Sequence, residues 1–198
     1  NGVFNDSTRA ALEEFQRSEG ITADGVFGPE TRDTMVRAAG GDPTPAPGGD
    51  LPAGFLSENV TLDEMTRSAT ADRLGIDNSP NAEERRSLEQ VAQQVIEPIK
   101  EQFPSARITS GFRSEGVNNA IGGSPFSQHR SGEAVDFAFD DPNTSFRDAM
   151  KFMVDNGIPF DQAIDERDHL HVGLDTDGNN RFQTLNEPRE GVFVPLQL

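Results

Sequence analysis

The chain has only three histidines, and two of them, His169 and His171, lie in one short segment. The third, His129, lies in a Ser-Gln-His-Arg-Ser-Gly-Glu-Ala-Val-Asp segment that ends at Asp136. Imidazole nitrogen and carboxylate oxygen suit zinc, and catalytic zinc sites typically use three protein ligands and leave the fourth position to water. His129, Asp136 and His171 would supply such a set. Because cysteine is absent, any metal must be held by nitrogen and oxygen.

Two kinds of element must position these side chains. Residues 134–139 alternate as a strand does, which places Asp136 on the face opposite Val135 and Phe137. His129 belongs to the loop before this strand, where small residues let the backbone fold tightly.

A closing pair of strands is expected at residues 160–164 and 169–174. Residues two apart on a strand share a face, so His169 and His171 can both point into one cleft. Asp136 joins them if its strand is a neighbour.

The rest of this region is predicted to mix helices with short strands. Asn81 and Glu84 form a capping box that opens a long amphipathic helix, and Pro98 should kink its last turn. Residues 107–110 read as a strand, and residues 145–156 as a helix ended by Gly157. Strands and helices do not alternate regularly, which favours an α+β fold around a small, mainly antiparallel sheet flanked by helices. The apolar positions of the long helix are Leu88, Val91, Val95, Ile96, Ile99 and Phe103.

The first forty residues contain a short repeat, in which Asn-Gly-Val-Phe at the start of the chain returns as Asp-Gly-Val-Phe from Asp24. Each copy leads from a glycine turn into a helix. The second copy, Asp24 to Thr31, resembles the Asp-Gly-x-x-Gly-x-x-Thr hallmark of the peptidoglycan-binding type 1 domain, a small all-helical module. That family has another helix ahead of the first repeat, so the module is expected to be incomplete at its N-terminus.

A stretch rich in proline and glycine separates this module from the rest of the chain. We expect the module at 1–39, a linker at 40–54 and a second domain at 55–198. The alternative for the first unit is a pair of helices that serves only for packing or dimerisation.

The formal net charge is -17 at pH 7, so the surface repels nucleic acid and anionic membranes. No apolar run approaches the roughly 20 residues needed to cross a bilayer, and no signal peptide opens the sequence. We expect a soluble monomer with no nucleic-acid partner and no membrane insertion.

The histidine segments carry a second resemblance. Ser127-x-His129-x-x-Gly132-x-Ala134-x-Asp136, followed by His169-x-His171, resembles the zinc D-Ala-D-Ala metallopeptidases, relatives of lysostaphin-type peptidases and of the hedgehog signalling domain. The segments 108–114 and 118–123 are also similar to that family. The resemblance implies that His129, Asp136 and His171 bind zinc.

The same resemblance implies roles for four further residues. Arg113 would orient a carboxylate or carbonyl of the substrate peptide, although an ordinary ion pair is an equal alternative. His169 would stabilise the oxyanion without ligating the metal. The family's acidic base lies three residues before the last ligand, which matches Asp168. That base is most often glutamate, and Glu166 is close enough in the chain to be a rival.

The expected function is therefore a zinc-dependent peptidase that hydrolyses stem or cross-bridge peptides of peptidoglycan, with both peptide and glycan as partners. D,D-carboxypeptidase, D,D-endopeptidase, L-Ala-D-Glu endopeptidase and phage endolysin all fit the sequence. The expected location is the cell wall, the periplasm or outside the cell. The alternative is a catalytically silent, zinc-containing protein that binds or recognises the wall.

Overall fold

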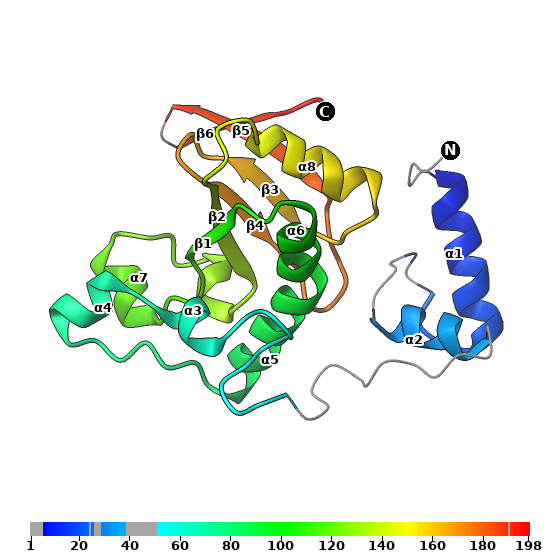
Figure 1. Ribbon diagram of the computed structural model, residues 1–198, viewed down its shortest axis with the longest axis horizontal. Helices are drawn as coiled ribbons and strands as arrows, with labels where there is room; N and C mark the ends of the chain where they lie inside the picture. Colours follow the sequence, from blue (N-terminus) through cyan, green and yellow to red (C-terminus); the bar gives the residue numbers. More distant parts are fainter. Residues whose placement is uncertain (1–5, 24, 26–28, 39–50, 190) are drawn as a thin grey trace.

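The protein is described here by a computed structural model covering residues 6–23, 25, 29–38, 51–189 and 191–198. Within these residues the C-terminal region forms a mixed six-stranded sheet in the order β1-β2-β4-β3-β5-β6, with helices packed around it (Figure 1). Every strand pairing is antiparallel except that between β3 and β5. The predicted α+β class with a mainly antiparallel sheet is confirmed.

The strands are β1 (Ala106–Ser110), β2 (Ala134–Phe139), β3 (Gln162–Asp165), β4 (Leu170–Gly173), β5 (Gln183–Arg189) and β6 (Val192–Pro195). The helices of the same region are α3 (Leu62–Thr66), α4 (Ala69–Leu74), α5 (Ala82–Val91), α6 (Glu97–Gln102), α7 (Glu115–Ala120) and α8 (Phe146–Asp155). A π-helical segment, η1 (Ala92–Ile96), joins α5 to α6, and a 3-10 turn, η2 (Gln128–Ser131), precedes β2.

The predicted long helix is present as α5, η1 and α6 in succession. Its capping box is formed as expected, because Asn81 accepts from the backbone of Glu84 and Glu84 accepts in return from the backbone of Asn81. Near Pro98 the outcome differs in detail from a simple kink, since a wider π-helical turn directly precedes the short α6 that contains this proline. A widened turn accommodates the ring and the missing N–H of a proline within a continuing helix.

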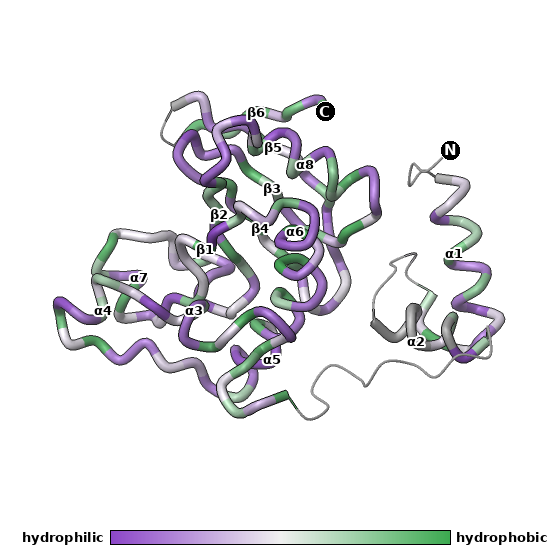
Figure 2. Tube along the Cα trace, in the orientation of Figure 1, coloured by the Kyte–Doolittle hydropathy of each residue, from purple (hydrophilic) through white to green (hydrophobic). Residues whose placement is uncertain are grey.

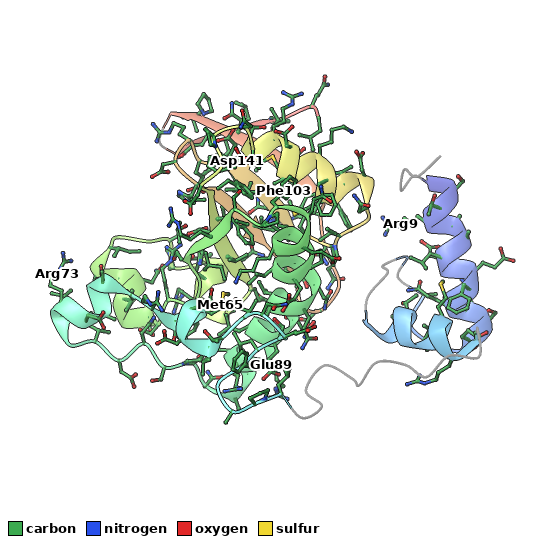
Figure 3. The ribbon with its side chains drawn as sticks, in the orientation of Figure 1. Arg9, Met65, Arg73, Glu89, Phe103 and Asp141 are labelled. Atoms are coloured by element: carbon green, nitrogen blue, oxygen red, sulfur yellow. The ribbon has the colours of Figure 1, made fainter. Side chains whose placement is uncertain are left out.

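One face of the sheet packs on this helix and on α8 to form the core. Val135 and Phe137 of β2 and Leu170 and Val172 of β4 are fully or almost fully buried there. Phe103, labelled in Figure 3, packs edge to face against rings from β2 and α8 at centroid distances of 5.6 and 5.5 Å. Along β2, β3 and α8, apolar residues are interspersed with polar ones (Figure 2). The opposite face of the central strands β2 and β4 carries polar side chains.

The register of the strands defines that opposite face. Asp136 pairs with His171 across β2 and β4, and His171 pairs with Ile164 across β4 and β3. Directly paired residues of antiparallel strands point to the same side. The alternation that sends Val135 and Phe137 into the core therefore sends Asp136 and His171 together to the other side, as the sequence predicts.

The N-terminal unit consists of α1 (Asp6–Glu19) and α2 (Pro29–Ala38). Leu12 is buried, and the two helices are joined by a buried polar contact in which Gln16 donates to the hydroxyl of Thr31 at 2.9 Å. The same side chain accepts from the backbone N–H of Gly25 at 2.8 Å. This contact gives the threonine of the repeat a structural role. Most of the predicted linker and the first glycine turn lie outside the described residues.

None of the helices in the described parts of the chain is long and apolar enough to span a membrane.

Candidate metal centre

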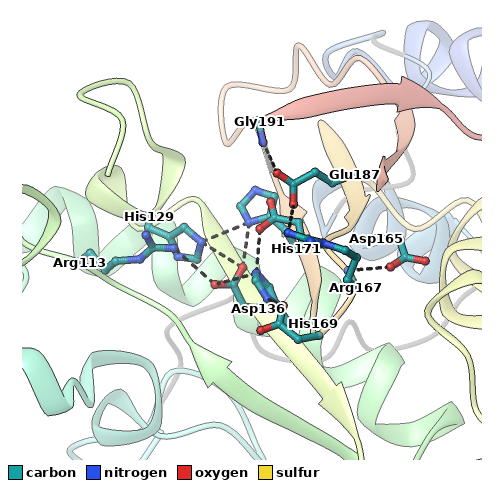
Figure 4. Close-up of polar contacts among 11 residues, drawn as sticks. Arg113, His129, Asp136, Asp165, Arg167, His169, His171, Glu187 and Gly191 are labelled. Carbon is teal, nitrogen blue, oxygen red and sulfur yellow. Dashed lines mark hydrogen bonds and ion pairs between the residues drawn. The ribbon is translucent and has the colours of Figure 1, made fainter. Parts of the chain in front are cut away.

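The three predicted ligands, His129, Asp136 and His171, converge on the polar face of the sheet (Figure 4). His129 Nε2 lies 3.1 Å from Asp136 Oδ1 and 3.2 Å from His171 Nδ1, and these last two atoms are 2.9 Å apart. In a tetrahedral zinc site with bonds of about 2.05 Å, neighbouring ligand atoms lie about 3.3 Å apart. The three donors are therefore placed nearly as a tetrahedral ion requires.

Two of the ligands, His129 and Asp136, are held in the protonation states that metal binding needs. His129 Nδ1 donates to the carbonyl oxygen of Gly111 at 2.6 Å, which leaves the lone pair of Nε2 facing the other two residues. Burial lowers the pKa of His129 and so favours its neutral form. Burial by itself would raise the pKa of Asp136, but the two neighbouring imidazoles more than offset this and lower it well below its usual range.

Local structure explains why His129 can approach the strands. It lies on the 3-10 turn η2, which is capped at its C-terminal end by Gly132 with a φ of 74°. A side chain there would be strained, and its Cβ would lie 2.5 Å from the carbonyl oxygen of Glu84. The glycine of the histidine motif is therefore required both by the turn and by the packing of that turn on α5.

Arg113, for which the sequence suggests a substrate contact, lies beside the three donors. Its Nη2 is 3.4 Å from Asp136 Oδ2, and its Nε is buried without a hydrogen-bond partner. Its backbone N–H donates to the carbonyl of His129 at 3.0 Å. A buried N–H with no acceptor is costly unless a ligand supplies one. This guanidinium is therefore suited to donate a hydrogen bond to an oxygen atom of a bound molecule.

His169 also faces the site without joining the three-donor cluster. Its Nε2 lies 3.9 Å from Asp136 Oδ2 and 3.0 Å from Glu166 Oε2, and its Nδ1 lies 2.8 Å from Asp168 Oδ1. These carboxylates, Glu166 first, raise the pKa of His169 to about 9 even though burial opposes the rise. The imidazolium form would place a positive donor at the edge of the metal site.

The two candidate bases occupy different positions around His169. Glu166 is paired with His169 by a backbone hydrogen bond that extends the β3–β4 register, so its side chain shares the face of His171 and Asp136. Its side chain is 26% exposed and contacts the nitrogen of His169 that faces Asp136. Asp168 is 87% exposed and contacts the other nitrogen. The assignment of Asp168 as base therefore stays a prediction, and the geometry favours Glu166.

The turn that carries both carboxylates has support that the sequence does not reveal. Arg167 adopts a φ of 71°, which is unfavourable for a residue with a side chain. Its backbone N–H donates to Asp165 at 3.0 Å, and its guanidinium lies 3.7 Å from the buried carboxylate of Glu187 on β5 (Figure 4). Glu187 also accepts from the backbone of Gly191 at 2.6 Å. The last two strands thus brace the turn beside the site.

Comparison with known proteins places this centre in a family. The sequence model of the peptidase M15 family matches residues 58–173, and this range contains every residue of the metal centre. The chain belongs to the peptidase M15 family. Residues 1–35 match a second family model, which is described as a putative peptidoglycan binding domain.

A known relative is similar to this chain over about two thirds of the chain's length. The zinc D-Ala-D-Ala carboxypeptidase of Streptomyces albus G is 29% identical over 138 residues, which make up 69% of this chain and 48% of that protein. The chain thus spans about half the length of this relative. Both resemblances drawn from the sequence motifs are supported by these matches.

Proposed function

We propose that the protein is a zinc-dependent hydrolase of peptidoglycan that cleaves peptide bonds in the stem or cross-bridge. The observation that carries the proposal is the cluster of His129, Asp136 and His171, whose donor atoms lie within 3.2 Å of one another inside a peptidase M15 domain. The match to a peptidoglycan binding domain and the carboxypeptidase relative support peptidoglycan as the substrate. The protein would then act at the cell wall or outside the cell.

The three donors would hold the zinc and leave a fourth position to water. Zinc bound there would lower the pKa of that water toward neutrality and polarise the substrate carbonyl. Glu166, ionised because the hydrogen bond from His169 lowers its pKa more than burial raises it, would accept the proton as water attacks the carbonyl carbon. The same carboxyl would then return the proton to the departing amine.

Two cationic side chains complete the site. His169 would donate to the oxygen that gains charge as the carbonyl carbon becomes tetrahedral. Arg113 would use its unpartnered Nε and its Nη2 to hold a carboxylate or carbonyl of the substrate peptide. Together they would fix the scissile bond against the metal-facing side of the sheet.

The decisive experiment is incubation of the zinc-loaded protein with purified sacculi, followed by mass spectrometry of the released amines and peptides. Release of D-alanine alone would indicate a D,D-carboxypeptidase, as the name of the relative suggests. Loss of cross-linked dimers would indicate an endopeptidase. A protein that binds zinc and sacculi but releases nothing would instead be the silent wall-binding alternative.

A further inference from the structure

The residue next to the first metal ligand reaches across to the strands that carry the last one. Gln128 Nε2 donates to Asp161 Oδ2 at 3.2 Å, directly before β3. Its amide also lies against the backbone of Gly173 at the end of β4. A Cβ added to Gly173 would come within 2.1 Å of Gln128 Oε1, so the amide occupies the space that any other residue at position 173 would fill.

Asp161 is built into the sheet by several independent contacts. Its side chain is buried, and Arg181 donates to it from Nε at 2.7 Å, from Nη2 at 2.6 Å and from the backbone at 3.1 Å. The backbone N–H of Asp161 donates to Gly173 at 2.7 Å, and its carbonyl accepts from Gln183 at 3.0 Å. Its position is thus fixed relative to β4 and β5 at once.

The metal ligands differ in how their positions are determined. Asp136 and His171 are opposite each other on paired strands, so the sheet itself sets their separation. His129 lies on a four-residue 3-10 turn outside the sheet, and the carbonyl of Gly111 orients its ring. Several contacts hold this turn, including the hydrogen bond from the backbone of Arg113 to His129 and the packing of Gly132 on α5. The side chain of Gln128 adds the tie to Asp161 and Gly173, so the distance from His129 to the strands depends on that side chain as well.

We propose that Gln128, Asp161 and Gly173 form a latch that sets the position of His129 relative to His171, with Arg181 fixing the carboxylate of Asp161. Partners outside the direct ligands that orient a metal site typically change metal affinity by 10–100-fold when removed. The inference rests on the metal site of the proposed function and is independent of which peptide bond is cut. It also extends the functional unit beyond residue 173, where the family match ends.

The test compares zinc affinity in Gln128→Ala and in the control Gln162→Ala. Gln162 suits this purpose because its amide donates to Gln183 at 3.1 Å in an exposed pair outside the latch. Each purified full-length variant is titrated with zinc against a chromophoric chelator. We expect the dissociation constant to rise about 10–100-fold in Gln128→Ala and to stay within about two-fold of the parent in Gln162→Ala.

A spectroscopic measurement separates positioning from general stabilisation. Cobalt(II) bound in place of zinc reports coordination geometry through its visible d–d bands, and we expect these bands to change in Gln128→Ala. Gly173→Ala, whose Cβ would displace the same amide, should change them in the same way. Urea unfolding of the metal-free forms should show little difference between Gln128→Ala and Gln162→Ala.

The possible failures are distinct. If the parent protein binds no zinc, the metal site and the latch both fail. If the parent binds zinc but Gln128→Ala matches Gln162→Ala in affinity and in cobalt spectrum, the latch alone is wrong. Because Gln128→Ala only removes atoms from a half-buried side chain, it tests the latch even where Gly173→Ala does not fold.

Discussion

The chemistry of the site depends on which imidazole nitrogen faces which oxygen. His129 and His171 each turn one ring nitrogen toward Asp136, whereas His169 directs its two nitrogens toward carboxylates outside that cluster. Two histidines separated by one residue can therefore have different roles, with His171 on β4 as a ligand and His169 just before that strand as a charged donor.

This difference predicts the outcome of removing each imidazole. His171→Ala should lose zinc, because the site keeps only two of its three donors, while His169→Ala should retain a full zinc equivalent and lose activity. Metal analysis of dialysed protein at neutral pH measures both. Full zinc retention in His171→Ala would refute the ligand assignment.

Zinc binding should also depend on pH in a defined direction. The ligand imidazoles must be neutral to bind, so zinc should be released as the pH falls. The lowered pKa of His129 moves its protonation to lower pH. Zinc release followed by a chelator during acid titration measures this, and occupancy that rises on acidification would contradict it.

The identity of the base is tested by two matched amide substitutions. Glu166→Gln keeps the shape of the side chain but cannot accept the proton, so turnover should fall by roughly 10²–10⁴-fold with zinc retained. Asp168→Asn should be much milder, because its carboxylate is turned toward solvent. Metal content and muropeptide cleavage of both variants decide the question. An active Glu166→Gln beside a dead Asp168→Asn would restore the base that the three-residue spacing implies.

At the element scale, the sequence predicted the parts whose pattern is local. The boundaries of β2 were predicted correctly, and the helix before Gly157 is present with Ser145 as its cap. The β3–β4 turn could not be read in the same way. Two-residue hairpin turns usually contain glycine or asparagine, whereas this one places Arg167 at a positive φ. The sequence alone therefore does not show which face of the sheet Glu166 occupies. The strand register of β3 and β4 in the structure shows it.

The sequence pattern does not indicate strands β5 and β6. Residues 183–189 are largely polar and include Pro188, and the side chains of β6 are all exposed. These segments become strands because the sheet supplies hydrogen-bonding partners, a tertiary effect that single-sequence patterns miss. The latch residues were missed for a related reason, since nothing local connects Gln128 with Asp161.

The junction of the helices with the loop before α3 gives a stability prediction. Glu97 accepts from the hydroxyl of Ser57 at 2.6 Å and from the backbone and side-chain amides of Asn59 at 2.6 and 2.9 Å. Burial raises the pKa of Glu97, but these hydrogen bonds lower it by more than burial raises it. The net pKa therefore lies below the usual 4.5. The stabilisation is therefore present above about pH 4.5 and is lost as the pH falls through the lower pKa of the folded state.

Glu97→Gln should accordingly destabilise the metal-free protein by about 1–3 kcal/mol at pH 7, the usual cost of weakening hydrogen bonds to a charged group. The difference from the parent should shrink as the pH falls below 4. Urea unfolding across this range measures it, and Glu101→Gln, at an exposed position of the same helix, is the control. A difference that grows on acidification would contradict the assigned pKa shift.

At the scale of the whole molecule, two family matches occupy separate parts of the chain. The peptidoglycan binding match covers residues 1–35 and the peptidase match covers residues 58–173. The stretch between them is rich in proline and glycine. The domain limits expected from composition stay a prediction, which cleavage of the chain can test.

The last prediction concerns what the first unit adds to the second. Limited proteolysis should cut between Gly40 and Gly54, because linkers with little to bury are exposed to proteases. The fragment from Phe55 onward should cleave soluble muropeptides at the rate of the full chain, since the metal centre and its latch lie entirely within it. On intact sacculi it should be slower, because a wall-bound module raises the effective concentration of the peptidase at its substrate. Rates for both forms on both substrates give the answer. Equal rates on sacculi would show that residues 1–39 do not target the wall, whereas a fragment slow on both substrates would show that these residues support the peptidase domain itself.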